Sequence, residues 1–113
     1  MSKIGYARVS TIDQDLTLQI QALKKAGCDL IRKEKVSGAS TKGRNELATV
    51  LEFLRKGDVL VVTRIDRLAR SIADLQDIVR TLKAAGATLK STEQPIDTST
   101  AAGKCFLDML GVF

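Results

Sequence analysis

Segments with the alternation of a β-strand are separated, along the whole chain, by segments with the periodicity of an α-helix. Such a sequence forms a parallel sheet, because each helix carries the chain back to the same end of the sheet. One strand candidate, VLVVT, is continuously apolar and β-branched, as expected of a strand covered on both faces. We therefore predict an α/β fold with a mainly parallel sheet of four or five strands and helices on both faces. The strands are predicted at 3–10, 29–36, 59–63 and 87–91, and the helices at about 13–26, 45–56, 64–86 and 101–113.

Composition limits the class of protein. A chain of 113 residues, 44% of them hydrophobic, fits one domain over residues 1–113 with a single modest core. The net charge of +5 suits a polyanionic partner, although charge alone is weak evidence. Cys28 and Cys105 stand far apart in apolar surroundings, which predicts reduced, buried thiols of a cytosolic protein. With no apolar run near the roughly 20 residues of a membrane span and no signal peptide, we expect a soluble cytoplasmic protein without a membrane partner.

The first strand carries an arginine and a serine to its end. In KIGYARVS, alternation places Tyr6, Arg8 and Ser10 on one face of the strand. The chain contains no histidine, which excludes a Ser-His-Asp site at Ser10 and leads us to expect no metal site. On local sequence alone, the favoured interpretation of Ser10 is a strand-end serine or an N-cap of the helix that starts near Asp13.

A second group of charged residues follows the VLVVT strand. Arg64, Asp66, Arg67 and Arg70 come directly after it, and Arg44 ends a Gly/Ser-rich loop that could reach the same place. If Asp66 opens the next helix, Arg67 and Arg70 lie on one face of it and Asp66 can reach Arg70. An isolated DRLAR would be interpreted as a solvated helix start. Because carboxyl ends of parallel strands meet at one edge of the sheet, however, these residues are predicted to lie beside Ser10.

Several guanidinium groups around one hydroxyl would repel one another unless an anion lay among them. Arginine pairs bidentately with phosphate oxygens and keeps its charge at all relevant pH values. A serine that attacks phosphorus also needs less help from a base where positive charge stabilises the transition state. The pattern therefore favours a phosphoryl centre.

The motifs at this edge resemble those of the serine recombinases, the family of resolvases and DNA invertases. The resemblance runs through the whole chain in the family's order. It rests on YARVST from Tyr6 with Gln14, Gln19 in the first helix, GR at 43–44, IDRLARS at 65–71 and DTSTAAGK at 97–104.

The resemblance implies a role for each matching residue. Ser10 would be the nucleophile that attacks a DNA phosphodiester and forms a 5′-phosphoserine link without a cofactor. Asp66 would orient the arginines or assist proton transfer. The phosphate and transition-state ligands would be Arg8, Arg44, Arg67 and Arg70, and the supporting residues Gln14, Gln19, Tyr6 and Arg64.

The last predicted helix carries an apolar stripe of Phe106, Met109, Leu110 and Phe113. The stripe is interpreted either as packing on its own domain or, by the resemblance, as a dimer interface of a homodimer that assembles into a tetramer on double-stranded DNA.

The chain departs from the family pattern in two kinds of place. Ala69 and Arg64 replace the glycine and lysine of many relatives, and both changes are expected to be tolerated. Family members continue this helix and add a helix-turn-helix domain, so residues 1–113 are expected to be a truncated catalytic domain.

Two other classes of function remain open from the residues. One is a DNA-binding or assembly module that keeps the fold without cleaving, which an assay for covalent protein–DNA adducts distinguishes. The other is a flavodoxin-like or receiver-like domain that binds a small phosphate ligand. The chain lacks the glycine-rich phosphate loop and the clustered acids of those domains, so this class is the least favoured.

Overall fold

The structure is a computed structural model that describes residues 2–10, 15–36, 45–69, 71–94 and 96–112. No helix within these ranges is long and apolar enough to cross a membrane. A short 3-10 helix, η1 (Ile65–Arg67), lies between β3 and α3. The strands are β1 (Lys3–Ser10), β2 (Leu30–Val36), β3 (Val59–Val62) and β4 (Thr88–Ser91), and the helices are α1 (Asp15–Lys25), α2 (Asn45–Phe53), α3 (Ile72–Ala85) and α4 (Ala101–Val112).

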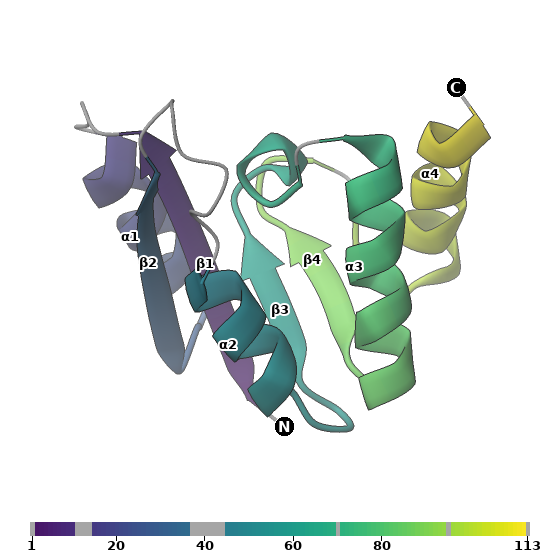
Figure 1. Cartoon of the computed structure of the whole chain (residues 1–113), viewed down its shortest axis with the longest axis horizontal. Coiled ribbons are helices and arrows are strands. Elements are labelled where there is room, and N and C mark those ends of the chain that lie inside the picture. The colour runs from purple at the N-terminus through teal and green to yellow at the C-terminus, as the bar shows by residue number, and fades with distance from the viewer. Residues whose placement is uncertain (1, 11–14, 37–44, 70, 95, 113) are drawn as a thin grey trace.

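The four strands form one sheet in the order β2-β1-β3-β4, and every neighbouring pair is parallel (Figure 1). The predicted α/β fold is thus confirmed. The chain moves outward from β1 to β2 and then returns to β3 on the other side of β1, so the strand order reverses between β1 and β3. In open parallel sheets the functional crevice lies at this reversal, beyond the carboxyl ends of the strands.

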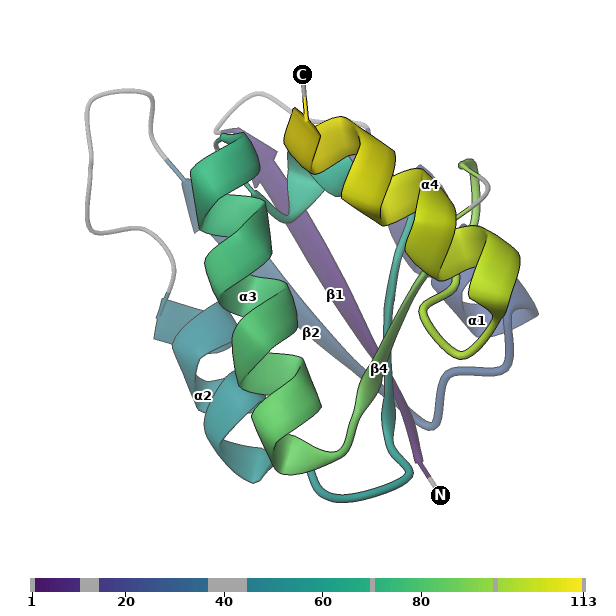
Figure 2. The ribbon, with the colours of Figure 1, turned by 90° about the vertical axis from the view of Figure 1, so that its right-hand side faces the viewer.

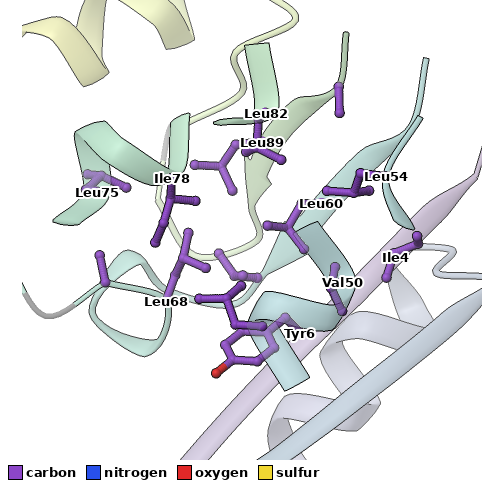
Figure 3. Close-up of a cluster of buried hydrophobic side chains, with 14 of the residues drawn as sticks. Ile4, Tyr6, Val50, Leu54, Leu60, Leu68, Leu75, Ile78, Leu82 and Leu89 are labelled. Atoms are coloured by element: carbon purple, nitrogen blue, oxygen red, sulfur yellow. The ribbon is translucent and has the colours of Figure 1, made fainter. Parts of the chain in front are cut away.

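Each face of the sheet has its own apolar cluster. The alternation predicted for β1 is confirmed, because Tyr6 and Ala7 are both fully buried but belong to different clusters. Tyr6 packs into the larger cluster, which α2 and α3 cover (Figure 3). Ala7 and Val61 pack with Leu23 of α1 on the other face. Figures 1 and 2 show α4 beside α3, and Figure 1 shows α1 at the opposite end of the molecule from both.

Helix α2 ends at Phe53, three residues before the predicted end. The cause is a turn closed by Asp58. Its carboxylate accepts a hydrogen bond from the Arg55 amide at 2.9 Å, and the Asp58 amide donates to the Arg55 carbonyl at 3.0 Å. Gly57 within this turn has a φ of 89°, a conformation that glycine adopts without strain.

The third predicted helix is two elements. η1 ends at Arg67, and α3 begins only at Ile72, after Ser71, whose hydroxyl accepts from the Asp74 amide at 3.1 Å as an N-cap. The prediction that Asp66 opens a helix running on through Arg70 is therefore wrong. The Ser71 cap starts the regular helix later, and Arg70 itself lies outside the described residues.

Helix α4 is tied to the turn before it. The Thr100 hydroxyl accepts from the Gly103 amide at 3.0 Å, so Thr100 caps the helix. Gly103 lies directly on the backbone of Asp97. A methyl group at Gly103 would lie 2.0 Å from the Asp97 carbonyl oxygen, so this contact admits only glycine.

The segment after β4 folds back along the outer edge of that strand. The Leu89 amide donates to the Thr98 hydroxyl at 2.8 Å, and the Thr98 amide donates to the Leu89 carbonyl at 2.9 Å. The Ser91 amide donates to the Ile96 carbonyl at 2.9 Å. These bonds occupy main-chain groups that an edge strand would otherwise leave open.

The two thiols differ from the expectation. Cys105 is exposed, so the prediction of a buried thiol is wrong there. The reason is helical geometry: Gly103 faces the domain, and a residue two positions later points away from it. Cys28 is half-buried, and its burial raises the pKa of the thiol.

Acid is expected to loosen the turn before α4. The hydrogen bond from the Ser99 hydroxyl, aided by the Ser99 amide and by Lys90, outweighs partial burial and lowers the pKa of Asp97 below its ordinary value of 3.8. A carboxylate with a lowered pKa contributes stability above its unfolded pKa and loses it as the pH falls through its folded pKa. We expect urea midpoints measured between about pH 5 and pH 2 to fall less steeply for Asp97→Asn than for the wild type.

A second variant, Ser99→Ala, and the carboxylate of Asp58 help to interpret this measurement. Ser99→Ala removes the hydroxyl donor and should reproduce part of the Asp97→Asn effect. The slope should not vanish in either variant, because bonds from the Arg55 and Ser2 amides also lower the pKa of Asp58. Equal slopes in all three proteins would contradict the assignment to Asp97.

Candidate active site

The carboxyl ends of β1 and β3 bring the candidate residues together. Arg8 lies near the end of β1, and the backbone of Ser10 ends that strand. Asp66 and Arg67 lie in η1, directly after β3. The two segments touch, since Nη2 of Arg8 donates a hydrogen bond to the Asp66 carbonyl oxygen at 2.8 Å. The guanidinium of Arg8 thus spans the strand-order reversal and fixes η1 relative to β1.

Gln19 supports β1 from the opposite face of the sheet. Its side chain on α1 is buried, and Nε2 donates to the Arg8 carbonyl oxygen at 3.1 Å. The same arginine is therefore held by its main chain from α1 and by its side chain through η1.

Asp66 pairs with Arg64, and its predicted partner Arg70 lies outside the described residues. Its Oδ1 accepts from Nε of Arg64 at 2.9 Å, and both side chains are more than half exposed. An exposed pair of this kind contributes little to stability, so it serves better to orient the two groups than to hold the fold. η1 is anchored separately, because the Ile65 amide donates to Oε1 of Gln94 at 2.8 Å.

A hollow of about 300 Å³ opens between α1 and η1. Its lining contains two arginines and one acid, together with residues of α1. These are Arg64, Arg67, Glu93, Leu18 and Gln19. Arg67 is half-buried, which reduces the screening of its charge by water. The hollow places a partly desolvated guanidinium close to the end of β3, where an anion could bind.

Tyr6 and Glu34 form a buried pair beneath this edge. Tyr6 is fully buried, and its hydroxyl donates to Oε2 of Glu34, which is 8% exposed. Oε1 of Glu34 accepts from the Glu46 amide at the start of α2, at 2.9 Å. Sequence reasoning missed Glu34. The available signal was an acid between two lysines in a strand, whose register with β1 places it opposite Arg8.

The remaining predicted residues are described only in part or not at all. Gln14, Arg44, Arg70 and Phe113 lie outside the described residues. For Ser10 the structure describes the backbone, and for Phe106 and Leu110 the helical backbone of α4. Met109 is 55% exposed, so at least this member of the apolar stripe does not pack on its own domain.

The sequence of the chain matches a known family over almost its whole length. The family described as "Resolvase, N terminal domain" matches residues 3–113. The chain therefore belongs to the resolvase family of serine recombinases, and the resemblance inferred from its motifs is confirmed.

Curated relatives carry names from recombination. The chain is 63% identical to the integrase-like protein y4lS of Sinorhizobium fredii, over all of this chain and 62% of that protein. It is 50% identical to the probable DNA-invertase y4cG of the same organism, over 96% of this chain and 35% of that protein. It is 43% identical to the DNA-invertase hin of Salmonella typhimurium, over 97% of this chain and 57% of that protein. The chain thus spans between about a third and two thirds of these relatives.

Solved structures agree with the fold. The N-terminal catalytic domain of TP901-1 integrase is 29% identical and superposes with a TM-score of 0.77, over 97% of this chain and 92% of that one. A resolvase family site-specific recombinase from Streptococcus pneumoniae is 23% identical with a TM-score of 0.74, over 99% of this chain and 85% of that one, and supports the fold alone.

Proposed function

We propose that this chain is the catalytic domain of a site-specific recombinase that cleaves and rejoins double-stranded DNA through Ser10. The observation that carries the proposal is the Arg8 bridge. It joins the strand that ends at Ser10 to the segment that holds Asp66 and Arg67, at the strand-order reversal of the sheet. Family membership supports the same activity.

The chemistry is a transesterification. The Ser10 hydroxyl oxygen attacks phosphorus, an O–P bond to the serine forms, and the bond from phosphorus to the 3′-oxygen breaks. The serine loses its proton, the leaving oxygen gains one as a 3′-hydroxyl, and the DNA keeps a 5′-phosphoserine link. The reverse attack by a 3′-hydroxyl rejoins the strand. Because one phosphodiester replaces another, the reaction needs no nucleotide.

The chain contains no histidine, so in this proposal the arginine cations stabilise the transition state. Arg8 and Arg67 lie at the edge where the transition-state charge develops, and well-placed donors of this type contribute about 3–4 kcal/mol each. We assign Arg44 and Arg70 to the same phosphate, and Asp66 to the orientation of its arginine neighbours. Gln14, Gln19, Tyr6 and Arg64 support these groups.

We infer that the chain acts as part of a homodimer that pairs into a tetramer on DNA, with α4 at the dimer contact. The exposure of Met109 supports an outward apolar stripe, which also contains Phe106, Leu110 and Phe113. Site choice is assigned to DNA-reading elements outside residues 1–113.

The test is covalent capture. A hybrid invertase is built, in which this chain replaces the region it matches in the DNA-invertase hin. It is incubated with the DNA site of that invertase carrying a nick that prevents rejoining. We expect a covalent protein–DNA adduct, and peptide mass spectrometry should locate the phosphodiester on Ser10. Specific DNA binding without any adduct would instead favour a non-cleaving assembly module.

Arg8→Lys is expected to slow cleavage by the hybrid invertase by roughly two orders of magnitude, as loss of a single transition-state donor does. Lysine keeps the charge but loses the planar fork, so it cannot contact the Asp66 carbonyl and a phosphate with the same geometry. The measurement is the single-turnover cleavage rate. Arg80→Lys is the matched control, because Arg80 is an exposed arginine on α3 paired with Asp77. Equal rates for the two variants would show that Arg8 supplies charge only.

A further inference from the structure

Gln94 holds the start of η1 from a distant part of the chain. Its side-chain oxygen Oε1 accepts a hydrogen bond from the Ile65 amide at 2.8 Å, across 29 positions of sequence. The first amides of a helix have no partner within the helix, and a polar side chain just before it usually supplies one. Arg64 occupies that place before η1 and makes no side-chain cap bond. Gln94 therefore supplies the cap that the local sequence lacks.

η1 is too short to keep its own direction. It has three residues, and a single turn fixes several backbone angles for few hydrogen bonds. Leu68 directly follows it and is fully buried, which anchors its far end. Burial of an apolar side chain has no preferred direction, whereas a hydrogen bond has one. The bond from the Ile65 amide to Gln94 thus sets the angle at which η1 leaves β3.

Gln94 itself stands on a rigid support. Before it, the Glu93 amide donates to the Thr63 carbonyl at 3.0 Å, which continues the pairing of β4 with β3. After it, the Ile96 amide donates to the Gln94 carbonyl at 2.7 Å, and the Ile96 side chain is buried in the core. Figure 1 shows this segment at the carboxyl ends of β3 and β4. The cap of η1 is therefore fixed to the sheet.

The bond bears on the residues that the proposed chemistry uses. Asp66 and Arg67 follow Ile65 in η1. Arg8 donates from β1 to the Asp66 carbonyl oxygen at 2.8 Å. η1 is thus held by Arg8 through its middle residue and by Gln94 through its first residue. Loss of the Gln94 contact would let the Arg67 guanidinium move relative to the end of β1.

We propose that Gln94 is a positioning residue for DNA cleavage, which caps η1 so that Asp66 and Arg67 lie at the distance from the end of β1 that the reaction needs. The inference rests on the proposed function. Gln94 acts through η1 in this account and not by contact with DNA, because its oxygen is taken by the Ile65 amide. Catalytic geometry tolerates little error, and a misplacement of about 1 Å can cost about a hundredfold in rate.

The test measures cleavage and DNA binding separately in the hybrid invertase. Gln94→Met keeps the length of the side chain but replaces the acceptor oxygen by a weakly accepting sulfur. We expect it to lower the single-turnover cleavage rate at saturating DNA by roughly tenfold to a hundredfold, with an unchanged dissociation constant for DNA. Gln94→Glu should retain most of the wild-type rate, because a carboxylate oxygen can accept the same bond from the Ile65 amide.

A shorter amide and an exposed glutamine serve as comparisons. Gln94→Asn keeps the amide group on a shorter side chain, so its oxygen falls short of the Ile65 amide and cleavage should be slow. This variant decides the question even where Gln94→Met fails to fold. Gln76→Met makes the same chemical change at an exposed position of α3 and should cleave as the wild type does.

Hydrogen exchange reports the bond itself, independently of cleavage. A hydrogen-bonded amide exchanges only when its bond opens. In this chain the Ile65 amide should exchange roughly tenfold or more faster in Gln94→Met than in the wild type, and at close to the wild-type rate in Gln94→Glu. Equal exchange in the wild type and Gln94→Met would show that Gln94 does not cap η1.

Two outcomes of the cleavage assay would overturn the inference. In the first, Gln94→Met and Gln94→Asn cleave at the wild-type rate. In the second, Gln94→Glu is as slow as Gln94→Met, so that the acceptor is not what matters. If the wild type forms its adduct on Ser10, either outcome refutes the role of Gln94 and leaves the recombinase assignment standing. A wild-type hybrid invertase without an adduct on Ser10 refutes the proposed function, and this inference with it.

Discussion

Alanine in place of Ser10 is expected to abolish adduct formation by the hybrid invertase, with a fall in the cleavage rate of about 10⁴-fold or more, as for loss of other nucleophiles that form covalent intermediates. The change removes one hydroxyl group from the end of β1, where the backbone remains held by its pairing with β2. Folding and DNA affinity should therefore stay at the wild-type level.

The measurement is the yield of covalent adduct on nicked DNA, with binding followed on the same DNA by gel shift. Ser2→Ala is the matched control, because Ser2 is an exposed serine directly before the opposite end of β1. It should form adducts at the wild-type rate. Adducts that persist in Ser10→Ala at the wild-type level would mean that another residue attacks the DNA, and the proposed function would need a different nucleophile.

Gly103→Ala is expected to destabilise the domain, although helix propensity alone predicts a gain of about 1 kcal/mol for this change. The added methyl group would lie 2.0 Å from the Asp97 carbonyl oxygen and 2.5 Å from the Asp97 nitrogen, and both are backbone atoms that cannot move without the turn. α4 must then shift away from the turn that caps it. Overpacking of this kind costs about 1–3 kcal/mol or more, so the sign of the change should reverse.

Urea unfolding of the isolated chain measures this effect, and Ala102→Gly provides the comparison. Ala102 is exposed on the same helix, and its replacement should cost only the propensity difference of about 1 kcal/mol. The structure thus predicts that both changes destabilise, for different reasons. A stabilised Gly103→Ala variant would show that α4 does not rest on Asp97.

Periodicity made the sheet predictable. In β1, alternation alone assigned Tyr6 and Ala7 to opposite faces, and each is fully buried in a separate cluster. In β3, the apolar run predicted cover on both sides, and Leu60 and Val61 are buried on opposite faces. These features depend on residues close together in the sequence, and the period of a strand or helix reports them directly.

Tertiary contacts explain what periodicity missed. The residues from Ile65 to Ala85 keep a helical spacing, but the Ser71 cap and the bond from the Ile65 amide to Gln94 divide them into two elements. Contacts between residues distant in the sequence also limited the prediction of the candidate active site. The grouping of Arg8 with η1 followed from the parallel sheet, whereas the buried position of Glu34 depends on bonds to residues 28 and 12 positions away.

The two edges of the sheet differ in a way that governs how copies of this chain can meet. The backward turn after β4 leaves Leu89 and Ser91 with bonded amides, so a strand from another molecule finds few open groups there. The outer edge at β2 carries Arg32 and Lys33, and like charges would oppose a second copy aligned against it. Sheet extension, the common route from a folded domain to an aggregate, is thereby blocked on one side by bonding and on the other by charge. Copies are left to associate through helices, whose side chains can separate and regroup without breaking a ladder of main-chain bonds.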